Sequence, residues 1–151
     1  MQNNSYMHVV IYTYTKGPWI VQPYFQYGNL PTNPKVGVAK GTSATGGAFN
    51  LSYAFKSGFS LPVRVEYLTS SGSATDGSVN LLGFGPGSAG TTFTATPTYQ
   101  KGGMYVRGDL AWVHAASYTP GNVFGATGTD ADQFRGVLEF GFIFGKNITE
   151  K

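Results

Sequence analysis

The sequence predicts an all-β protein, an antiparallel up-and-down transmembrane β-barrel with about seven strands in residues 1–151, and part of a larger barrel. Three observations lead to this fold class. Apolar and polar residues alternate along most of the apparent strands, as they do when successive side chains point to opposite faces of a sheet. Short turns and long polar connections also alternate, which is typical of membrane barrels. Charged residues make up only 11% of the chain, against roughly 25% in soluble domains.

The predicted strands are residues 7–14, 19–27, 47–55, 59–68, 91–100, 104–114 and 133–144. Residues 7–14 are rich in β-branched and aromatic residues, but their alternation is ambiguous. Pro23 weakens the second strand, because proline cannot donate to a ladder hydrogen bond. Residues 59–68 show the cleanest alternation, and residues 133–144 carry an aromatic face opposite Arg135 and Glu139. Strands of about 9 to 11 residues match the length of a tilted membrane crossing.

The connections predict which end of the barrel is which. Short turns lie near residues 16–18, 56–58 and 101–103. Long polar connections cover residues 28–46, 69–90 and 115–132, and the second of them contains an apolar patch at 79–84. In up-and-down membrane barrels the short turns are periplasmic and the long loops extracellular.

The polar face of the predicted strands is a candidate wall of a water-filled lumen. We expect the lumen to be lined by Gln22, Tyr24, Gln26, Arg64, Glu66, Arg107, Asp109, Arg135 and Glu139. The opposed charges either set the charge preference of a channel or form cross-strand ion pairs, each worth about 0.2–1 kcal/mol. The two interpretations are compatible. In a soluble sandwich, the same residues would form the solvent-facing side of a sheet.

The apolar face carries its aromatic residues near the strand ends and smaller residues, such as Val21, Leu51 and Val63, near the middle. Two aromatic girdles around an aliphatic band are typical of a protein that crosses a bilayer. A soluble core would place its largest side chains centrally. The candidate membrane-interface aromatics are Trp19, Tyr27, Phe59, Tyr67, Tyr99, Trp112 and Phe144.

Several function classes find no support in the sequence. The chain has no cysteine, and its net charge of +3 is not clustered, so neither thiolate chemistry nor nucleic-acid binding is expected. No basic segment followed by an apolar run marks a signal peptide, and no apolar run reaches the roughly 20 residues of a membrane helix. The glycines at 85, 87 and 90 precede a predicted strand rather than the helix that a dinucleotide site requires. We therefore predict no enzyme, catalytic residue, metal or cofactor.

Three stretches, TPTYQKGGMYVRGDLAWVHA at 96–115, NLLGFGPGS at 80–88 and DQFRGVLEFGFIF at 132–144, give the chain a resemblance to the OmpL-like β-barrel porin family of Gram-negative outer membranes. The resemblance implies a passive pore with more strands than are present here, of which this sequence is the C-terminal part. It also implies three partners: the lipid bilayer, small hydrophilic solutes or ions, and the outer-membrane assembly machinery. Residues 145–151 are expected to form a tail beyond the last strand.

The predicted function is passive diffusion of small hydrophilic solutes or ions across the outer membrane. Two alternatives remain: a soluble β-sandwich or barrel that binds a ligand or partner, and a non-conducting outer-membrane barrel with a structural or adhesive role. About seven strands is fewer than the minimum of 8 for bacterial single-chain barrels. We therefore expect an open sheet that other copies or a longer parent complete.

Overall fold

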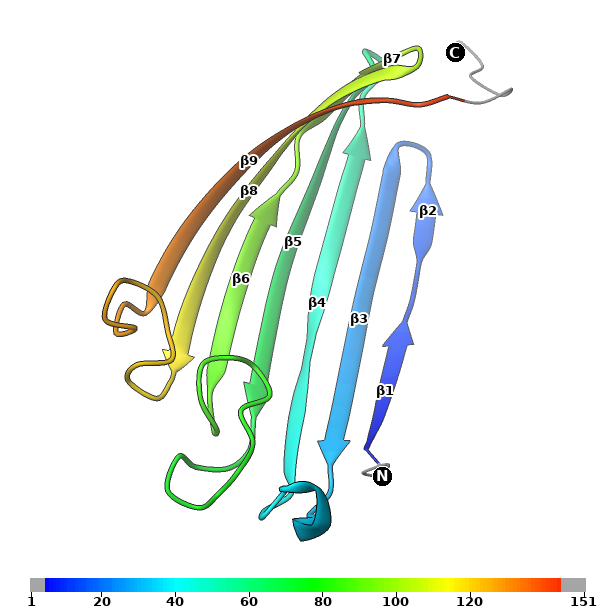
Figure 1. Ribbon diagram of the computed structural model, residues 1–151. Helices are drawn as coiled ribbons and strands as arrows, with labels where there is room; N and C mark the ends of the chain where they lie inside the picture. Colours follow the sequence, from blue (N-terminus) through cyan, green and yellow to red (C-terminus); the bar gives the residue numbers. More distant parts are fainter. Residues whose placement is uncertain (1–4, 145–151) are drawn as a thin grey trace.

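The computed structural model describes residues 5–144 as one curved antiparallel sheet (Figure 1). Its strands are β1 (Tyr6–Ile11), β2 (Tyr14–Lys16), β3 (Trp19–Leu30), β4 (Thr42–Ala54), β5 (Phe59–Ser70), β6 (Ala89–Ala95), β7 (Thr98–Lys101), β8 (Met104–Ser117) and β9 (Asp132–Phe142). A single 3-10 turn, η1 (Pro34–Val36), lies between β3 and β4. The all-β antiparallel fold predicted from the alternation is confirmed.

The nine strands occupy seven positions across the sheet. Both β1 and β2 pair with β3, while β6 and β7 follow one another between β5 and β8. The prediction of continuous strands at 7–14 and 91–100 is therefore wrong in detail. Prolines explain both interruptions, because they have no N–H to donate. Pro23 lies opposite Tyr12, between β1 and β2, and Pro62 and Pro97 lie at the break between β6 and β7. They act only as acceptors there: Tyr12 N donates to Pro23 O at 3.1 Å, and Gly108 N donates to Pro97 O at 2.9 Å.

Six strands, β3, β4, β5, β6, β8 and β9, extend further toward the long connections than predicted. β3 reaches Leu30, where it pairs with Thr42 of β4, and β5 reaches Ser70. β8 likewise continues to Ser117. These ends are rich in Ser, Thr and Gly, which carry little hydrophobic alternation but still pair through their backbones. The long connections are accordingly shorter, at 31–41, 71–88 and 118–131.

The short turns all lie at one end of the sheet and the long connections at the other (Figure 1). Two of the short turns are two-residue hairpin loops in which Gly17 and Gly102 both have φ of 56°, a conformation that glycine adopts without steric cost. β9 ends at Phe142 rather than Phe144. The predicted tail at 145–151 lies outside the described residues.

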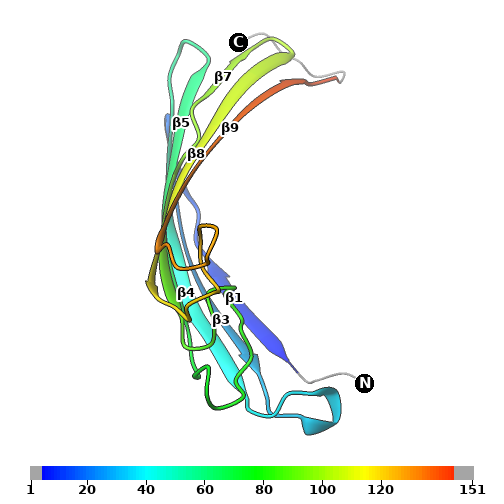
Figure 2. The ribbon, with the colours of Figure 1, turned by 60° about the vertical axis from the view of Figure 1, so that its left-hand side comes forward.

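The sheet forms an open arc (Figure 2). Within residues 5–144, β1 pairs only with β3 and β9 only with β8, so each has one edge without a partner strand. Since every adjacent pair is antiparallel and the sheet has seven positions, β1 and β9 run in the same direction. The arc does not close on itself.

Few side chains of the described residues are buried, and most of them lie near the long connections. Val38, Thr42, Ser70, Ser88 and Ala89 are all less than 9% exposed. Among the large apolar residues of the strands, many are instead exposed, including Phe49, Trp112 and Phe140. The best-packed part of the described chain is therefore its long-loop end.

In the part of the chain that the structure describes, no helix is long and apolar enough to cross a membrane.

Candidate pore wall

The strand registers define two neighbouring rows of residues that cross the sheet. The side chains of one row are apolar and those of the other are mostly polar. The apolar row runs through Val21, Leu51, Val63, Ala95, Leu110 and Gly136. The neighbouring polar row runs through Gln22, Asn50, Arg64, Thr94, Ala111 and Arg135. Because each residue is next in sequence to a member of the other row, the two rows must point to opposite sides.

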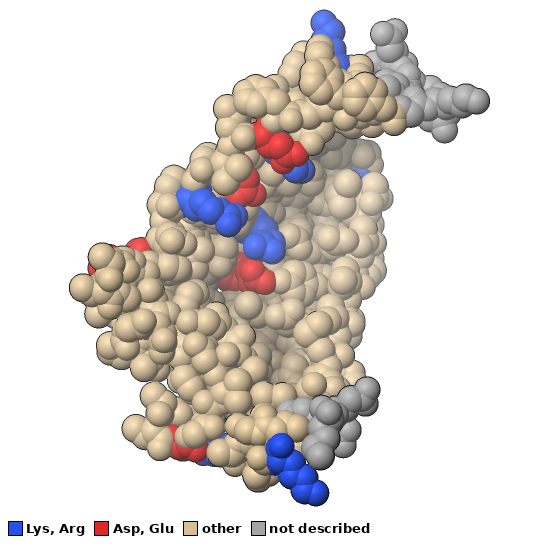
Figure 3. Space-filling model, in the orientation of Figure 1, with Lys and Arg blue, Asp and Glu red and all other residues tan. Residues whose placement is uncertain are grey.

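The polar row belongs to the concave face. Figure 3 shows the acidic and basic side chains of the strands gathered in a hollow of this face. The hollow is lined by Thr96, between β6 and β7, and by residues of β3, β4, β5, β6, β8 and β9, among them Gln22, Asn50, Arg64, Thr94, Asp109 and Arg135. Side chains from strands far apart in the sequence therefore share one polar surface, which we call the polar wall.

Six charged side chains of the polar wall form three ion pairs. Arg64 lies 3.4 Å from Glu66 along β5, and Arg135 of β9 lies 3.1 Å from Asp109 of β8. Arg107 is directly opposite Glu139 in the register of β8 and β9, and their charged groups are in close contact. Three arginines thus pair with three carboxylates, so the charges of these six side chains sum to zero.

Tyrosine hydroxyls extend two of these pairs. Tyr24 donates a hydrogen bond to Glu66, and Tyr105 donates one to Glu139. Glu139 thus receives hydrogen bonds from both Tyr105 and Arg107. Tyr105 was not among the predicted lumen residues, although its position two residues before Arg107 put it on the same face.

The remaining predicted lumen residues also lie on this face. Gln22 donates from Nε2 to Thr13 Oγ1 at 2.9 Å. Gln26 lies nearer the long connections, opposite Val9 of β1 and Gly46 of β4. The register of β1 adds three apolar residues that the ambiguous alternation left unassigned: Met7, Val9 and Ile11 share the face of Gln26 and Tyr24. At β1, the edge strand, the concave face is therefore apolar.

The convex face carries aromatic residues at both strand ends. Near the short turns, ring centroids lie 4.5 Å apart for Trp19 and Tyr53, 4.6 Å for Tyr53 and Phe55, and 5.4 Å for Phe55 and Phe59. Tyr99 is opposite Phe59 in the register, and Phe144 is 90% exposed. The short-turn end thus has a continuous aromatic cluster.

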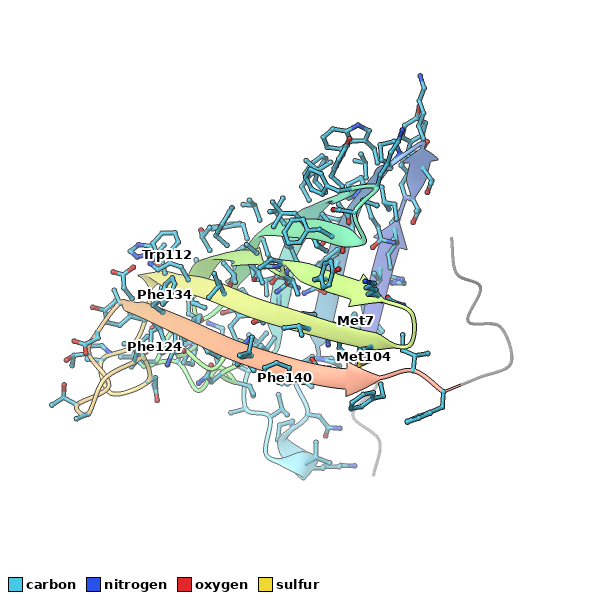
Figure 4. All side chains as sticks on the ribbon, turned by 90° about the horizontal axis from the view of Figure 1, so that it is seen from above. Met7, Met104, Trp112, Phe124, Phe134 and Phe140 are labelled. Atoms are coloured by element: carbon cyan, nitrogen blue, oxygen red, sulfur yellow. The ribbon has the colours of Figure 1, made fainter. Side chains whose placement is uncertain are left out.

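The other end of the convex face has its own aromatic row. Phe93, Trp112 and Phe134 are in register on β6, β8 and β9, and Figure 4 shows Trp112 and Phe134 together at the end of β8 opposite to Met104. Tyr67 of β5 also lies toward this end. The ring centroids of Tyr27 and Tyr6 are 6.2 Å apart. The apolar row from Val21 to Gly136 separates the two aromatic groups.

His114 of β8, at this end of the convex face, contacts residues close to it in the sheet. His114 Nδ1 lies 3.0 Å from Asp132, which also accepts a hydrogen bond from Trp112 Nε1 at 3.0 Å. Among residues 5–144, no group of three or more His, Asp or Glu side chains comes together that could hold a metal ion.

One comparison with known proteins agrees with this geometry. The family model described as "putative beta-barrel porin-2, OmpL-like" matches residues 1–144. A search of curated proteins finds no significant match, and a search of solved structures finds none either. Since the family model spans nearly the whole chain, the resemblance inferred from the sequence is confirmed, and this protein belongs to the OmpL-like family of β-barrel porins.

Proposed function

We propose that the protein forms the wall of a porin in the outer membrane of Gram-negative bacteria, through which small hydrophilic solutes or ions diffuse passively. The observation that carries this proposal is the separation of the two faces: the polar wall with its three ion pairs is concave, and the aromatic and aliphatic face is convex. A barrel built from such a sheet encloses the polar wall and turns the apolar face toward lipid.

The mechanism is hydration rather than chemistry. A solute that leaves water pays a desolvation penalty unless other polar groups replace the lost hydrogen bonds. The amide and hydroxyl groups of Asn50, Thr94 and Thr96 line the same hollow as Arg64 and Asp109, so a solute beside the wall keeps polar partners. Because the wall charges are balanced, their field acts across the pore rather than selecting strongly for one sign of ion.

The open edges define what completes the barrel. An edge strand in a bilayer would leave backbone N–H and C=O groups unpaired, which is costly without water. β1 and β9 run in the same direction, so joining them directly, within one copy or between copies, would create a parallel junction. An odd number of further antiparallel strands between them restores the all-antiparallel pattern of outer-membrane barrels. We include such strands in the proposed pore.

Solute flux into liposomes tests this function. The protein, purified as its cells produce it together with the strands that complete the barrel, is reconstituted into liposomes. The entry of sugars is followed by swelling, beside liposomes without protein. The proposal expects swelling with small sugars and a rate that falls as the sugar becomes larger. Folded, lipid-inserted protein without flux would favour a structural or adhesive barrel. A folded protein that stays soluble without detergent would favour the soluble ligand-binding alternative.

The aromatic groups at the two ends of the convex face support the bilayer as partner. Trp and Tyr side chains favour the interface between lipid and water, and Trp19 and Trp112 lie at opposite ends of this face. The outer-membrane assembly machinery is the partner we propose for insertion, as for other barrels of this membrane.

A further inference from the structure

The connection 71–88 folds onto the polar wall. Leu82 and Phe84 face Glu66, Leu68 and Thr92 across a space of only ≈140 Å³. Glu66 and Thr92 are cross-strand partners of β5 and β6, on the face that also carries Arg64. In Figure 2 the long connections turn toward the hollow side of the sheet. The apolar patch that the sequence shows at 79–84 is therefore directed into the proposed lumen.

A glycine makes this close approach possible. A Cβ at Gly90 of β6 would lie 3.0 Å from Cε2 of Phe84, which is tighter than ordinary van der Waals contact. Gly90 lies on the concave face, opposite Leu68. The missing side chain leaves room for the Phe84 ring against the wall.

The base of this connection is closed by buried hydrogen bonds. Ser70 N donates to Ser88 O at 2.7 Å, and Gly87 N donates to Ser71 O at 3.2 Å. Ser88 has no exposed surface. At the tip, the side-chain oxygen of Asn80 accepts hydrogen bonds from Gly83 N at 2.8 Å and Gly85 N at 3.1 Å. These bonds fix the turn that presents Leu82 and Phe84.

Both neighbouring connections hold the segment in place. On one side, Lys40 of the connection 31–41 forms an ion pair with Asp76, and Val79 N donates to Oγ1 of Thr42, the first residue of β4, at 3.1 Å. On the other side, Thr119 N donates to Phe84 O at 2.8 Å, and the rings of Phe84 and Phe124 meet edge to face with centroids 5.5 Å apart. The segment is thus fixed between two other connections rather than projecting freely from the sheet.

We propose that Leu82 and Phe84 form an apolar constriction at the long-loop mouth of the pore and determine the largest solute that passes. Apolar groups cannot replace water around a solute, so a solute must pass this point within the width that the two side chains leave, as at hydrophobic constrictions of other channels. This inference rests on the proposed function, because a constriction requires a pore.

Phe84→Ala tests the constriction in the liposome-swelling assay, with protein purified as its cells produce it. The matched control is Phe93→Ala, which removes the same ring from the convex face, where Phe93 is opposite Trp112. We expect larger sugars to enter several-fold faster through Phe84→Ala, and Phe93→Ala to keep the size limit of the unaltered protein. A Phe84→Ala protein with an unchanged or lower size limit would overturn the constriction while the porin function stands. Absence of flux from the unaltered protein would overturn both.

A cross-linking measurement locates the segment independently of flux. The chain contains no cysteine, so Leu82→Cys can be combined with Thr92→Cys on the polar wall or with Phe93→Cys on the opposite face. A short bifunctional thiol reagent is expected to join residues 82 and 92, detected as a linked peptide pair, and not residues 82 and 93. Equal linkage of both pairs, or linkage of neither, would contradict the inward fold.

Discussion

The ring of Tyr105 in β8 occupies the space that a side chain at Gly141 in β9 would fill. The two residues are cross-strand partners on the concave face. From this position the hydroxyl of Tyr105 reaches Glu139, which also binds Arg107. A glycine therefore determines how one ion pair of the polar wall is held, in the way that aromatic side chains cover glycines of neighbouring strands.

Gly141→Ala is expected to displace Tyr105 and break its hydrogen bond to Glu139, because the new Cβ would overlap the ring. We expect a loss on the order of 1 kcal/mol in the free energy of unfolding, measured by urea unfolding of the lipid-inserted protein. Gly136→Ala in the same strand is the control, since its Cβ would meet Leu110 at an ordinary 3.6 Å. Equal effects of the two substitutions would show that Tyr105 is not held by the glycine.

Charge insertion tests the assignment of the two faces. Val63 lies in the middle of the apolar row, and an arginine there should cost about 2–4 kcal/mol in a bilayer. Thr96→Arg should be tolerated, because Thr96 lines the polar hollow and its hydroxyl lies 3.5 Å from Asp109. The measurement is the free energy of unfolding from lipid vesicles. If the two arginines cost the same, the faces have been assigned wrongly.

Ion selectivity should respond to the charge balance of the wall. Glu139→Gln leaves three arginines facing two carboxylates, so anions should be favoured by a factor of about two to five in permeability. The readout is the reversal potential of the pore in a salt gradient. Arg107→Gln combined with Glu139→Gln removes both members of the pair and should return the selectivity to that of the unaltered protein. A double variant that remains anion-selective would argue against a simple charge count.

The ion pair between Lys40 and Asp76 should make the 71–88 segment resistant to mild acid. Contact with Lys40, followed by hydrogen bonds from Ser78 and Ser73, holds the pKa of Asp76 well below its usual value of 3.8. A carboxyl group with a lowered pKa stabilises the folded segment above the unfolded pKa, and this contribution is lost only as the pH falls through the folded pKa.

Amide hydrogen exchange at Ser73 and Ser78 measures this effect, since both amides donate to Asp76. Once the intrinsic exchange rates are corrected for, protection should be constant between about pH 7 and pH 4. Asp76→Asn should lower it across the same range, because the amide side chain cannot form the ion pair. Protection that already declines near pH 6 in the unaltered protein would refute the account.

The two faces of the sheet could be predicted because alternation is a local signal. Residues 59–68 and 133–144 show it directly, and β5 and β9 present those residues as expected. The proline interruptions were only partly visible. Pro23 weakens a strand on its own, but the break at Thr96 and Pro97 also depends on Pro62 in a neighbouring strand, and this pairing is known only from the register.

The contacts between distant segments could not be predicted. Arg135 pairs with Asp109, the diagonal neighbour of its register partner Ala111, and this partner is known only from the register of β8 and β9. The inward fold of 71–88 depends on the absence of a side chain at Gly90 and on contacts with both neighbouring connections. The sequence marked an apolar patch within a polar loop, but it could not indicate the surface that the patch covers.

The central claim, that the concave polar wall lines an aqueous pore, is tested most directly by recording current across a planar bilayer. The bilayer contains the protein purified as its cells produce it, with the strands that complete the barrel. We expect discrete current steps of uniform size that increase in proportion to the salt concentration. Folded protein inserted in the bilayer that gives no steps above the lipid background would contradict it.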